Sequence, residues 1–121
     1  MRKLIFFVDD EKSILNLLEY TMKIQDDYEI KTFSSGEDCI ENLELNPDLI
    51  VLDHKFKSGG TSGLETLKKI RKTNNTIPVI ILSAWDQQKI CEDYYNAGAT
   101  KYLTKDNYFI DSIMDTINQY L

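Results

Sequence analysis

Three aspartates stand at the ends of two apolar runs in the sequence. Asp9 and Asp10 follow the run at 4–8, and Asp53 follows the run at 49–52. Both runs are continuously apolar, rich in branched and aromatic residues, and too short for helices, which indicates buried parallel strands. The carboxyl ends of parallel strands share one edge of an open sheet, and ligands bind at that edge. We therefore expect the three carboxylates to converge around a hard cation such as Mg²⁺, without which their charges would repel one another.

Two more strand ends add a hydroxyl and an ammonium group to this edge. Ser83 closes the apolar run at 79–82, and Lys105 follows a short strand at 101–103. These groups fit phosphoryl transfer to a carboxylate, because Mg²⁺ and Lys105 would neutralise charge on the phosphoryl oxygens while Asp53 attacks in line. The predicted product is an aspartyl phosphate.

Each of these side chains also has an ordinary structural interpretation when it is considered alone. Asp9 and Asp10 are typical of a helix N-cap and a first helical turn. Ser83 is typical of a turn after a strand, and Lys105 of a solvated surface charge. The functional interpretation is favoured because all four would share one edge with Asp53.

The elements that must position these residues alternate between strands and helices. Apolar spacings of three, four and seven residues indicate amphipathic helices between the short apolar runs. Strands are predicted at 4–8, 28–33, 49–52, 79–82 and 101–103, with helices up to about 23, from Ser35 to near Pro47, from Leu64, up to about 97, and over 110–121. Because right-handed crossovers are nearly obligatory, this order predicts an α/β fold with a doubly wound, five-stranded parallel sheet. The whole chain, 1–121, is expected to form a single domain.

The first strand-to-helix turn argues against the nucleotide or flavin binding that is common in such folds. Residues 8–13 read Val-Asp-Asp-Glu-Lys-Ser, with neither the Gly-x-Gly-x-x-Gly of a dinucleotide site nor the Gly-Lys-Ser/Thr of a phosphate loop. A glycine-rich stretch at 59–63 lacks an adjacent lysine, so we interpret it as a flexible loop.

Composition narrows the class of protein further. The 121 residues carry 14 basic and 20 acidic side chains, a net charge of −6, which argues against direct binding of nucleic acid or of an anionic membrane. The apolar run after Met1 is shorter than a secretory signal and ends in acids, and no segment is long enough to span a bilayer. Cys39 and Cys91 lack metal-ligand spacing, so a cytoplasmic protein with reduced thiols is expected.

Several short motifs follow one another along the chain. They are Val8-Asp9-Asp10-Glu11, the segment 47–53 that ends in Leu52-Asp53, Gly63-Leu64-Glu65, Leu82-Ser83-Ala84, Ala97-Gly98-Ala99 and Tyr102-Leu103-Thr104-Lys105. In this order and spacing they resemble the response-regulator receiver domain of two-component signalling, over essentially all of the chain. The resemblance implies a flavodoxin-like (βα)5 fold with strand order 2-1-3-4-5.

The resemblance also implies a role for each residue of the predicted site. Asp53 would be the phosphoacceptor. Asp10, Asp53 and the backbone carbonyl of Lys55 would bind Mg²⁺, and Asp9 would assist through a water molecule. His54 has no such role in the family and no companion ligands, so we interpret it as a loop residue.

Signalling in this family depends on the movement of two side chains. Ser83 and Lys105 would grip the phosphoryl group, and Ser83 would move toward it while Tyr102 turns inward. Such a two-state element is biased by the new charge. The output would be read on the face formed by the fourth helix, the fifth strand and the fifth helix. Three tyrosines lie on or near that face, each equally well explained by ordinary packing: Tyr94, Tyr95 and Tyr108.

The predicted function is that of a stand-alone receiver, phosphorylated by a partner histidine kinase or histidine phosphotransfer protein. It would act on a downstream protein target or as a phosphate relay, and would catalyse its own phosphorylation and dephosphorylation without being a classical enzyme. An excised receiver of a longer regulator or hybrid kinase fits the same sequence. A metal-dependent phosphatase is disfavoured, because His54-Lys55 stands where such enzymes carry an Asp-x-Asp pattern. A degenerate, phosphorylation-independent receiver is also disfavoured, because it would be expected to have lost a site residue and none is missing here.

Three features depart from the family pattern. Lys105 is followed by Asp106 rather than by a cis proline, and since a non-proline cis bond costs about 2.5–4 kcal/mol, we expect a trans bond with an altered loop. The segment 55–62 is longer than usual and lacks the customary Met-Pro. Trp85 lies two residues beyond Ser83, where its ring would shield the acyl phosphate from water, so slow self-dephosphorylation is expected.

Overall fold

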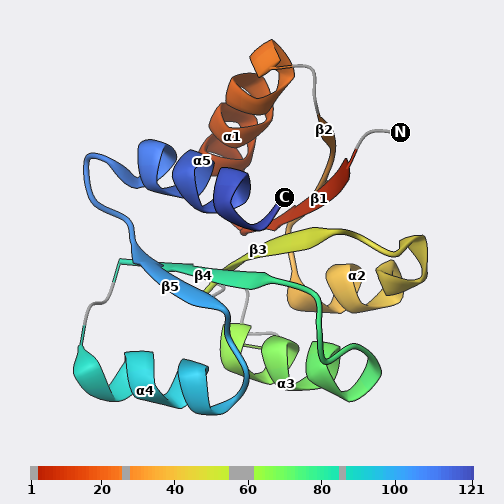
Figure 1. Ribbon diagram of the computed structural model, residues 1–121, viewed down its shortest axis with the longest axis vertical. Coiled ribbons are helices and arrows are strands. Elements are labelled where there is room, and N and C mark those ends of the chain that lie inside the picture. Colours follow the sequence, from red (N-terminus) through yellow and green to blue (C-terminus); the bar gives the residue numbers. More distant parts are fainter. Residues whose placement is uncertain (1–2, 26–27, 55–61, 85–86) are drawn as a thin grey trace.

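The computed structural model describes residues 3–25, 28–54, 62–84 and 87–121. Within these residues, five parallel strands form one sheet in the order β2-β1-β3-β4-β5 (Figure 1). The strands are β1 (Lys3–Val8), β2 (Tyr28–Phe33), β3 (Leu49–Asp53), β4 (Val79–Ser83) and β5 (Lys101–Thr104). The predicted doubly wound α/β fold and its strand order are therefore confirmed.

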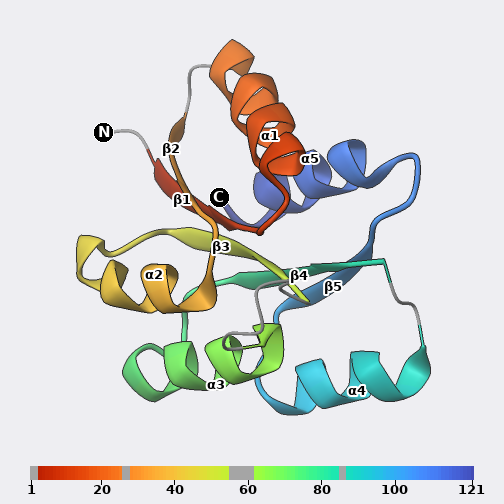
Figure 2. The same cartoon turned by 180° about the vertical axis from the view of Figure 1, so that it is seen from behind.

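The helices lie on both faces of this sheet. On one face are α1 (Lys12–Gln25) and α5 (Phe109–Tyr120), and on the other are α2 (Gly36–Glu41), α3 (Gly63–Thr73) and α4 (Gln88–Asn96) (Figures 1 and 2). Serine hydroxyls cap two of them. Ser35 Oγ accepts the N–H of Asp38 at 3.2 Å at the start of α2, and Ser62 Oγ plays the same part for α3. In the described part of the chain, none of the helices is both long and apolar enough to cross a bilayer.

The second helix is shorter than the sequence predicts. It ends at Glu41, and the chain continues as a 3₁₀ turn, η1 (Leu43–Leu45). Asn46 then adopts a left-handed conformation with a φ of 57°, which its short polar side chain tolerates better than most. The apolar spacing of this segment did not distinguish an α-helix from a helix that tightens into a 3₁₀ turn.

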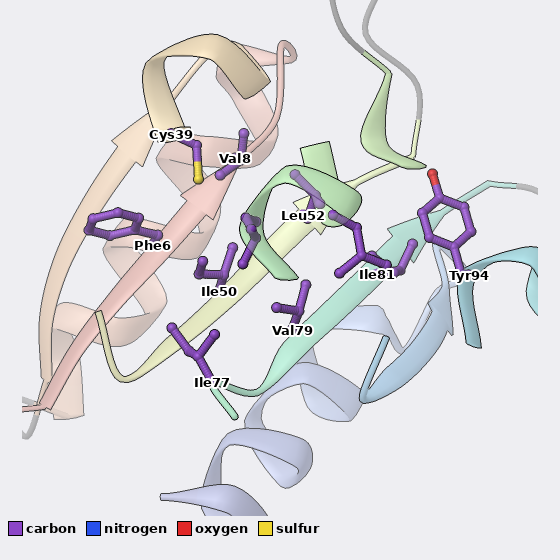
Figure 3. Packing of buried hydrophobic residues seen from close by; sticks show 11 residues of the cluster. Phe6, Val8, Cys39, Ile50, Leu52, Ile77, Val79, Ile81 and Tyr94 are labelled. Atoms are coloured by element: carbon purple, nitrogen blue, oxygen red, sulfur yellow. The ribbon is translucent and has the colours of Figure 1, made fainter. Parts of the chain in front are cut away.

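Alternating side chains of the sheet build two apolar clusters, one on each face. The cluster against α2, α3 and α4 contains Phe6, Val8, Cys39, Ile50, Leu52, Leu67, Ile70, Ile77, Val79, Ile81 and Tyr94 (Figure 3). The cluster against α1 and α5 contains Ile5, Phe7, Leu15, Leu18, Met22, Leu49, Val51, Ile80, Leu82, Ile113 and Ile117. Burial of such side chains contributes roughly 1.5–3 kcal/mol each. Every residue of β3 and β4 is buried, so the ends of these strands are firmly fixed.

Backbone hydrogen bonds hold the strand ends level at the carboxyl edge. Asp53 of β3 pairs with Leu82 of β4. Just beyond β3, the N–H of His54 donates to the carbonyl of Leu82 at 3.1 Å, and the N–H of Lys105 donates to the carbonyl of Ser83 at 2.6 Å. The side chains that follow β3, β4 and β5 are thereby presented on one edge.

Candidate functional site

Lys105 bridges two buried carboxylates at the carboxyl edge of the sheet. Its Nζ lies 2.9 Å from Oδ1 of Asp53 and 3.1 Å from Oδ2 of Asp9. Asp53 is 5% exposed and Asp9 is 3% exposed, so both carboxylates are withdrawn from water. Removing one partner from such a buried pair leaves an uncompensated charge, which is strongly unfavourable. The structure thus brings together three of the residues that the sequence predicts at this edge.

Asp10 adds a third carboxylate to the same edge. Carboxylate oxygens of Asp9, Asp10 and Asp53 lie within 4.8 Å of one another. Within the described residues, the buried Oδ2 of Asp9 contacts the Lys105 ammonium at 3.1 Å and is reached by no other donor. One lysine neutralises one of three acidic charges. The remaining negative charge and the hard oxygen donors fit Mg²⁺.

Asp9 combines the structural and the functional interpretation of its position. Its Oδ1 accepts the N–H of Glu11 at 2.9 Å, immediately before α1, while its Oδ2 faces Lys105. Its own N–H donates to the carbonyl of Phe33 at 3.0 Å. The turn that begins α1 therefore fixes the direction of this carboxylate.

Burial and mutual repulsion shift the titration of these acids. The pKa of Asp53 is raised to about 6, chiefly by burial and then by the charge of Asp9, against the opposing hydrogen bond from Lys105. Burial also raises the pKa of Asp9, against the N–H of Glu11 and the charge of Lys105. For Lys105, burial lowers the pKa, but its contacts with both carboxylates outweigh burial and leave the pKa raised. The lysine is a fixed cation, whereas the carboxylates would gain from a further cation.

The two predicted switch residues lie on neighbouring strands. Ser83 ends β4 and is 1% exposed. Tyr102 lies on β5, half-buried, with its ring centroid 5.7 Å from that of Tyr94 on α4. The N–H of Tyr102 also donates to the hydroxyl of Tyr95 at 3.0 Å. Two successive tyrosines of α4 therefore contact the same residue of β5, one from the buried side and one from the exposed side.

The loop after Lys105 is closed without a proline. The Lys105–Asp106 peptide is trans, as expected, since the described residues contain no cis bond. The N–H of Asp106 donates to the carbonyl of Thr104 at 2.8 Å, and its Oδ1 accepts the N–H of Tyr108 at 2.8 Å. A local turn thus takes the place of the cis bond. The predictions for Lys55, for most of the 55–62 loop and for Trp85 lie outside the described residues.

One contact beside the site was missed by the sequence analysis. The hydroxyl oxygen of Tyr94 lies 2.5 Å from Nδ1 of His54, and the hydroxyl donates to the carbonyl of His54 at 3.3 Å. The two residues are 40 positions apart, so no local pattern could have paired them. The spacing of four between Ile90 and Tyr94 could have predicted that this tyrosine, rather than Tyr95, faces the sheet.

Comparison with known proteins gives concordant matches. A family model for the response regulator receiver domain matches residues 5–118. The alkaline phosphatase synthesis transcriptional regulatory protein PhoP of Bacillus subtilis (strain 168) is 36% identical over 106 residues, which cover 87% of this chain and 43% of that protein. This chain therefore spans less than half the length of that relative.

Solved structures agree with this match. The response regulator TrrA of Thermotoga maritima, solved in complex with Mg(2+)-BeF, is 31% identical, with a TM-score of 0.83 over 98% of this chain and 99% of that one. The Vibrio cholerae chemotaxis protein CheY4 has a TM-score of 0.89 over the whole of both chains. At 21% identity, CheY4 supports the fold alone.

Proposed function

Because the chain belongs to the response regulator receiver domain family of two-component systems, we propose that Asp53 accepts a phosphoryl group from a histidine kinase or a histidine phosphotransfer protein. The observation that carries this proposal is the position of Lys105 Nζ, 2.9 Å from the carboxylate that would be modified. The same ammonium also contacts Asp9, so it stays at the edge when the charge on Asp53 changes.

The proposed transfer needs a carboxylate nucleophile and a way to disperse charge. An ionised Asp53 oxygen attacks phosphorus in line, the bond from phosphorus to the donor nitrogen breaks, and the nitrogen keeps the electron pair. With a pKa of about 6, Asp53 is mostly ionised at neutral pH. Lys105 would move its hydrogen bonds from the carboxylates to the phosphoryl oxygens, and Ser83 would hold another of these oxygens.

Asp9, Asp10 and Asp53 would hold Mg²⁺, together with the backbone carbonyl of Lys55. The mutual distances of the three carboxylates, and their excess of negative charge over the single Lys105 ammonium, support this assignment. When bound, the ion supplies positive charge against the phosphoryl oxygens.

Phosphorylation would then change the face made by α4, β5 and α5, which a downstream protein would recognise. The contacts of Tyr102 with Tyr94 and Tyr95 support this part of the proposal, because a movement of Tyr102 cannot leave α4 undisturbed. We propose a cytoplasmic receiver that binds neither nucleic acid nor membrane by itself. The same switch would serve a stand-alone receiver or the receiver of a longer regulator or hybrid kinase.

Phosphorylation by a small donor tests the proposal. The protein is incubated with acetyl phosphate and Mg²⁺ and its intact mass is measured; we expect a gain of one phosphoryl group that Asp53→Asn abolishes. The alternative, a metal-dependent phosphatase, would instead release phosphate steadily from unrelated phosphate esters. Absence of any mass gain in the unmodified chain would rule out Asp53 as a phosphoacceptor under these conditions.

A further inference from the structure

Tyr94 is a buried polar side chain that the proposed transfer does not use. It is 1% exposed and lies at one end of the apolar cluster between the sheet and the helices α2 to α4 (Figure 3). A buried hydroxyl needs a hydrogen-bond partner, because leaving it without one costs free energy. Its partners are therefore informative.

Two contacts of this hydroxyl are with His54, the residue that follows the proposed phosphoacceptor, and a third is a hydrogen bond with the backbone of Leu64 at the start of α3. The hydroxyl oxygen lies 2.5 Å from the ring Nδ1, and the hydroxyl donates to the backbone carbonyl at 3.3 Å. The two rings meet edge to face, with centroids 5.3 Å apart. A helix residue is thus hydrogen-bonded to the backbone one peptide away from Asp53.

Gly63 shows how closely the elements approach at this point. Its N–H, at the start of α3, donates to the same His54 carbonyl at 3.0 Å. A Cβ at Gly63 would lie 2.3 Å from the carbonyl oxygen of Asp53 and 2.7 Å from the Tyr94 hydroxyl, so only glycine fits without displacement. The Tyr94 side chain is therefore packed tightly against the end of β3 and the start of α3.

The hydroxyl keeps its proton. Burial raises the pKa of Tyr94 well above its ordinary value, and the nearby Tyr102 and Asp53 raise it further. A protonated hydroxyl has one proton to donate, either to the His54 carbonyl or to Nδ1 of the His54 ring, so in both cases it stays bonded to His54. The Tyr94 side chain extends from α4, and its ring lies beside that of Tyr102.

We propose that Tyr94 is a positioning residue that couples the state of Asp53 to the position of α4, through the backbone carbonyl and ring of His54. The proposal rests on the proposed function, since it takes phosphorylation of Asp53 as the input. A hydrogen bond is sensitive to shifts of a few tenths of an ångström, so a movement of the backbone after β3 is felt at α4. This route reaches α4 from β3 directly and does not pass through Ser83.

The test separates the hydroxyl from the ring. Tyr94→Phe removes the hydroxyl and keeps the aromatic packing, and Tyr20→Phe is the matched control, because Tyr20 is 68% exposed on α1. Amide chemical shifts are recorded with and without beryllium fluoride and Mg²⁺, which stand in for the phosphoryl group. We expect the shift changes of residues 88–96 to be about fivefold smaller in Tyr94→Phe, because one hydrogen bond is lost, and to be unchanged in Tyr20→Phe. Shift changes at Ser83 and Lys105 should persist in both variants.

A second variant guards against a fold defect in the first. His54→Leu removes the ring partner and leaves the Tyr94 side chain intact, and we expect a smaller loss of the α4 response because the backbone carbonyl still accepts. An unchanged α4 response in Tyr94→Phe would overturn the coupling, as would equal losses at α4 and at Ser83 and Lys105, which would indicate a merely structural role. A wild-type chain that gains no phosphoryl mass would contradict the proposed function, and the coupling with it. A gain of phosphoryl mass without amide shift changes at residues 88–96 would contradict the coupling alone.

Discussion

Two cations at opposite ends of the sheet are held by partners of different kinds. At the carboxyl edge, Lys105 lies between the carboxylates of Asp53 and Asp9, with Asp10 close by. At the amino edge, the guanidinium of Arg71 in the last turn of α3 meets neutral acceptors alone, as far as the described residues go. These are the carbonyls of Ile77 at 2.7 Å, Gly98 at 2.9 Å and Asn74 at 3.2 Å, and the hydroxyl of Thr100 at 3.5 Å.

The difference separates a structural clamp from a reactive site. The acceptors of Arg71 belong to the connections that precede β4 and β5, so the guanidinium ties these two connections to α3. None of its partners among the described residues carries a charge that could change. Lys105 faces more negative charge than it can neutralise. Perturbed and unbalanced titratable groups of that kind are typical of functional sites.

Removal of the lysine should have the largest effect. Lys105→Met leaves buried carboxylates without their cation, so we expect phosphorylation by acetyl phosphate to slow by about 10²–10³-fold and the free energy of unfolding to fall by about 3 kcal/mol at pH 7. Mass spectrometry over time and denaturant unfolding measure the two effects. Lys89→Met is the matched control, because the Lys89–Asp93 pair is exposed and should contribute almost nothing. Equal behaviour of the two variants would mean that Lys105 contributes no more than an exposed surface lysine.

The pH dependence of stability should come from the carboxyl edge. The pKa of Asp53 is raised from 3.8 to about 6 in the folded state, so between these values the folded protein binds more protons than the unfolded chain. The free energy of unfolding should therefore decrease as pH rises from about 4 to about 6, by about 3 kcal/mol in total. Denaturant unfolding in EDTA across this range measures it, and Asp53→Asn should remove this part of the slope. A wild-type slope no steeper than that of Asp53→Asn would contradict the assignment.

Mg²⁺ should stabilise one edge and leave the other unaffected. A cation that binds only the folded state at one hundred times its Kd adds about 2.7 kcal/mol to the free energy of unfolding. We expect a gain of this size in the wild type, its reversal by EDTA, and a much smaller gain in Asp10→Asn. Arg71→Met should show the full gain, because Arg71 is at the opposite end of the strands. An undiminished gain in Asp10→Asn would mean that the ion binds elsewhere.

The carboxyl edge could be predicted from the sequence because the topology of a parallel sheet determines which residues meet there. Asp9 and Asp53 each close a short apolar run and Lys105 follows a short strand, and parallel strands necessarily bring such positions to one edge. Residue type then supplies the chemistry, since an acid or a lysine at the end of a buried strand is conspicuous. The strand order followed from the resemblance, and the sheet has that order.

The amino edge and the Tyr94 contact could not be predicted for the opposite reason. Of the four acceptors that Arg71 meets among the described residues, three are backbone carbonyls, which every residue carries, so nothing in the sequence marks Ile77 or Gly98 as a partner. Tyr94 likewise meets a backbone carbonyl and a ring 40 residues away. Contacts of this kind depend on how helices settle on the sheet, and that depends on the packing of the whole cluster.

Loss of the arginine should have the smallest of these effects, and it should be confined to stability. Arg71→Met keeps the apolar length of the side chain but leaves the carbonyls of Ile77 and Gly98 without this donor, so we expect the free energy of unfolding to fall by about 2 kcal/mol. Arg71→Lys should recover only part of this, because an ammonium cannot reach acceptors on several sides as the planar guanidinium does. Lys72→Met, exposed in the same turn, is the control. Phosphorylation of Asp53 should proceed at the wild-type rate in all three variants, because a clamp with neutral partners has no charge to exchange with the site. A slower rate in Arg71→Met alone would show that the two ends of the sheet are energetically linked.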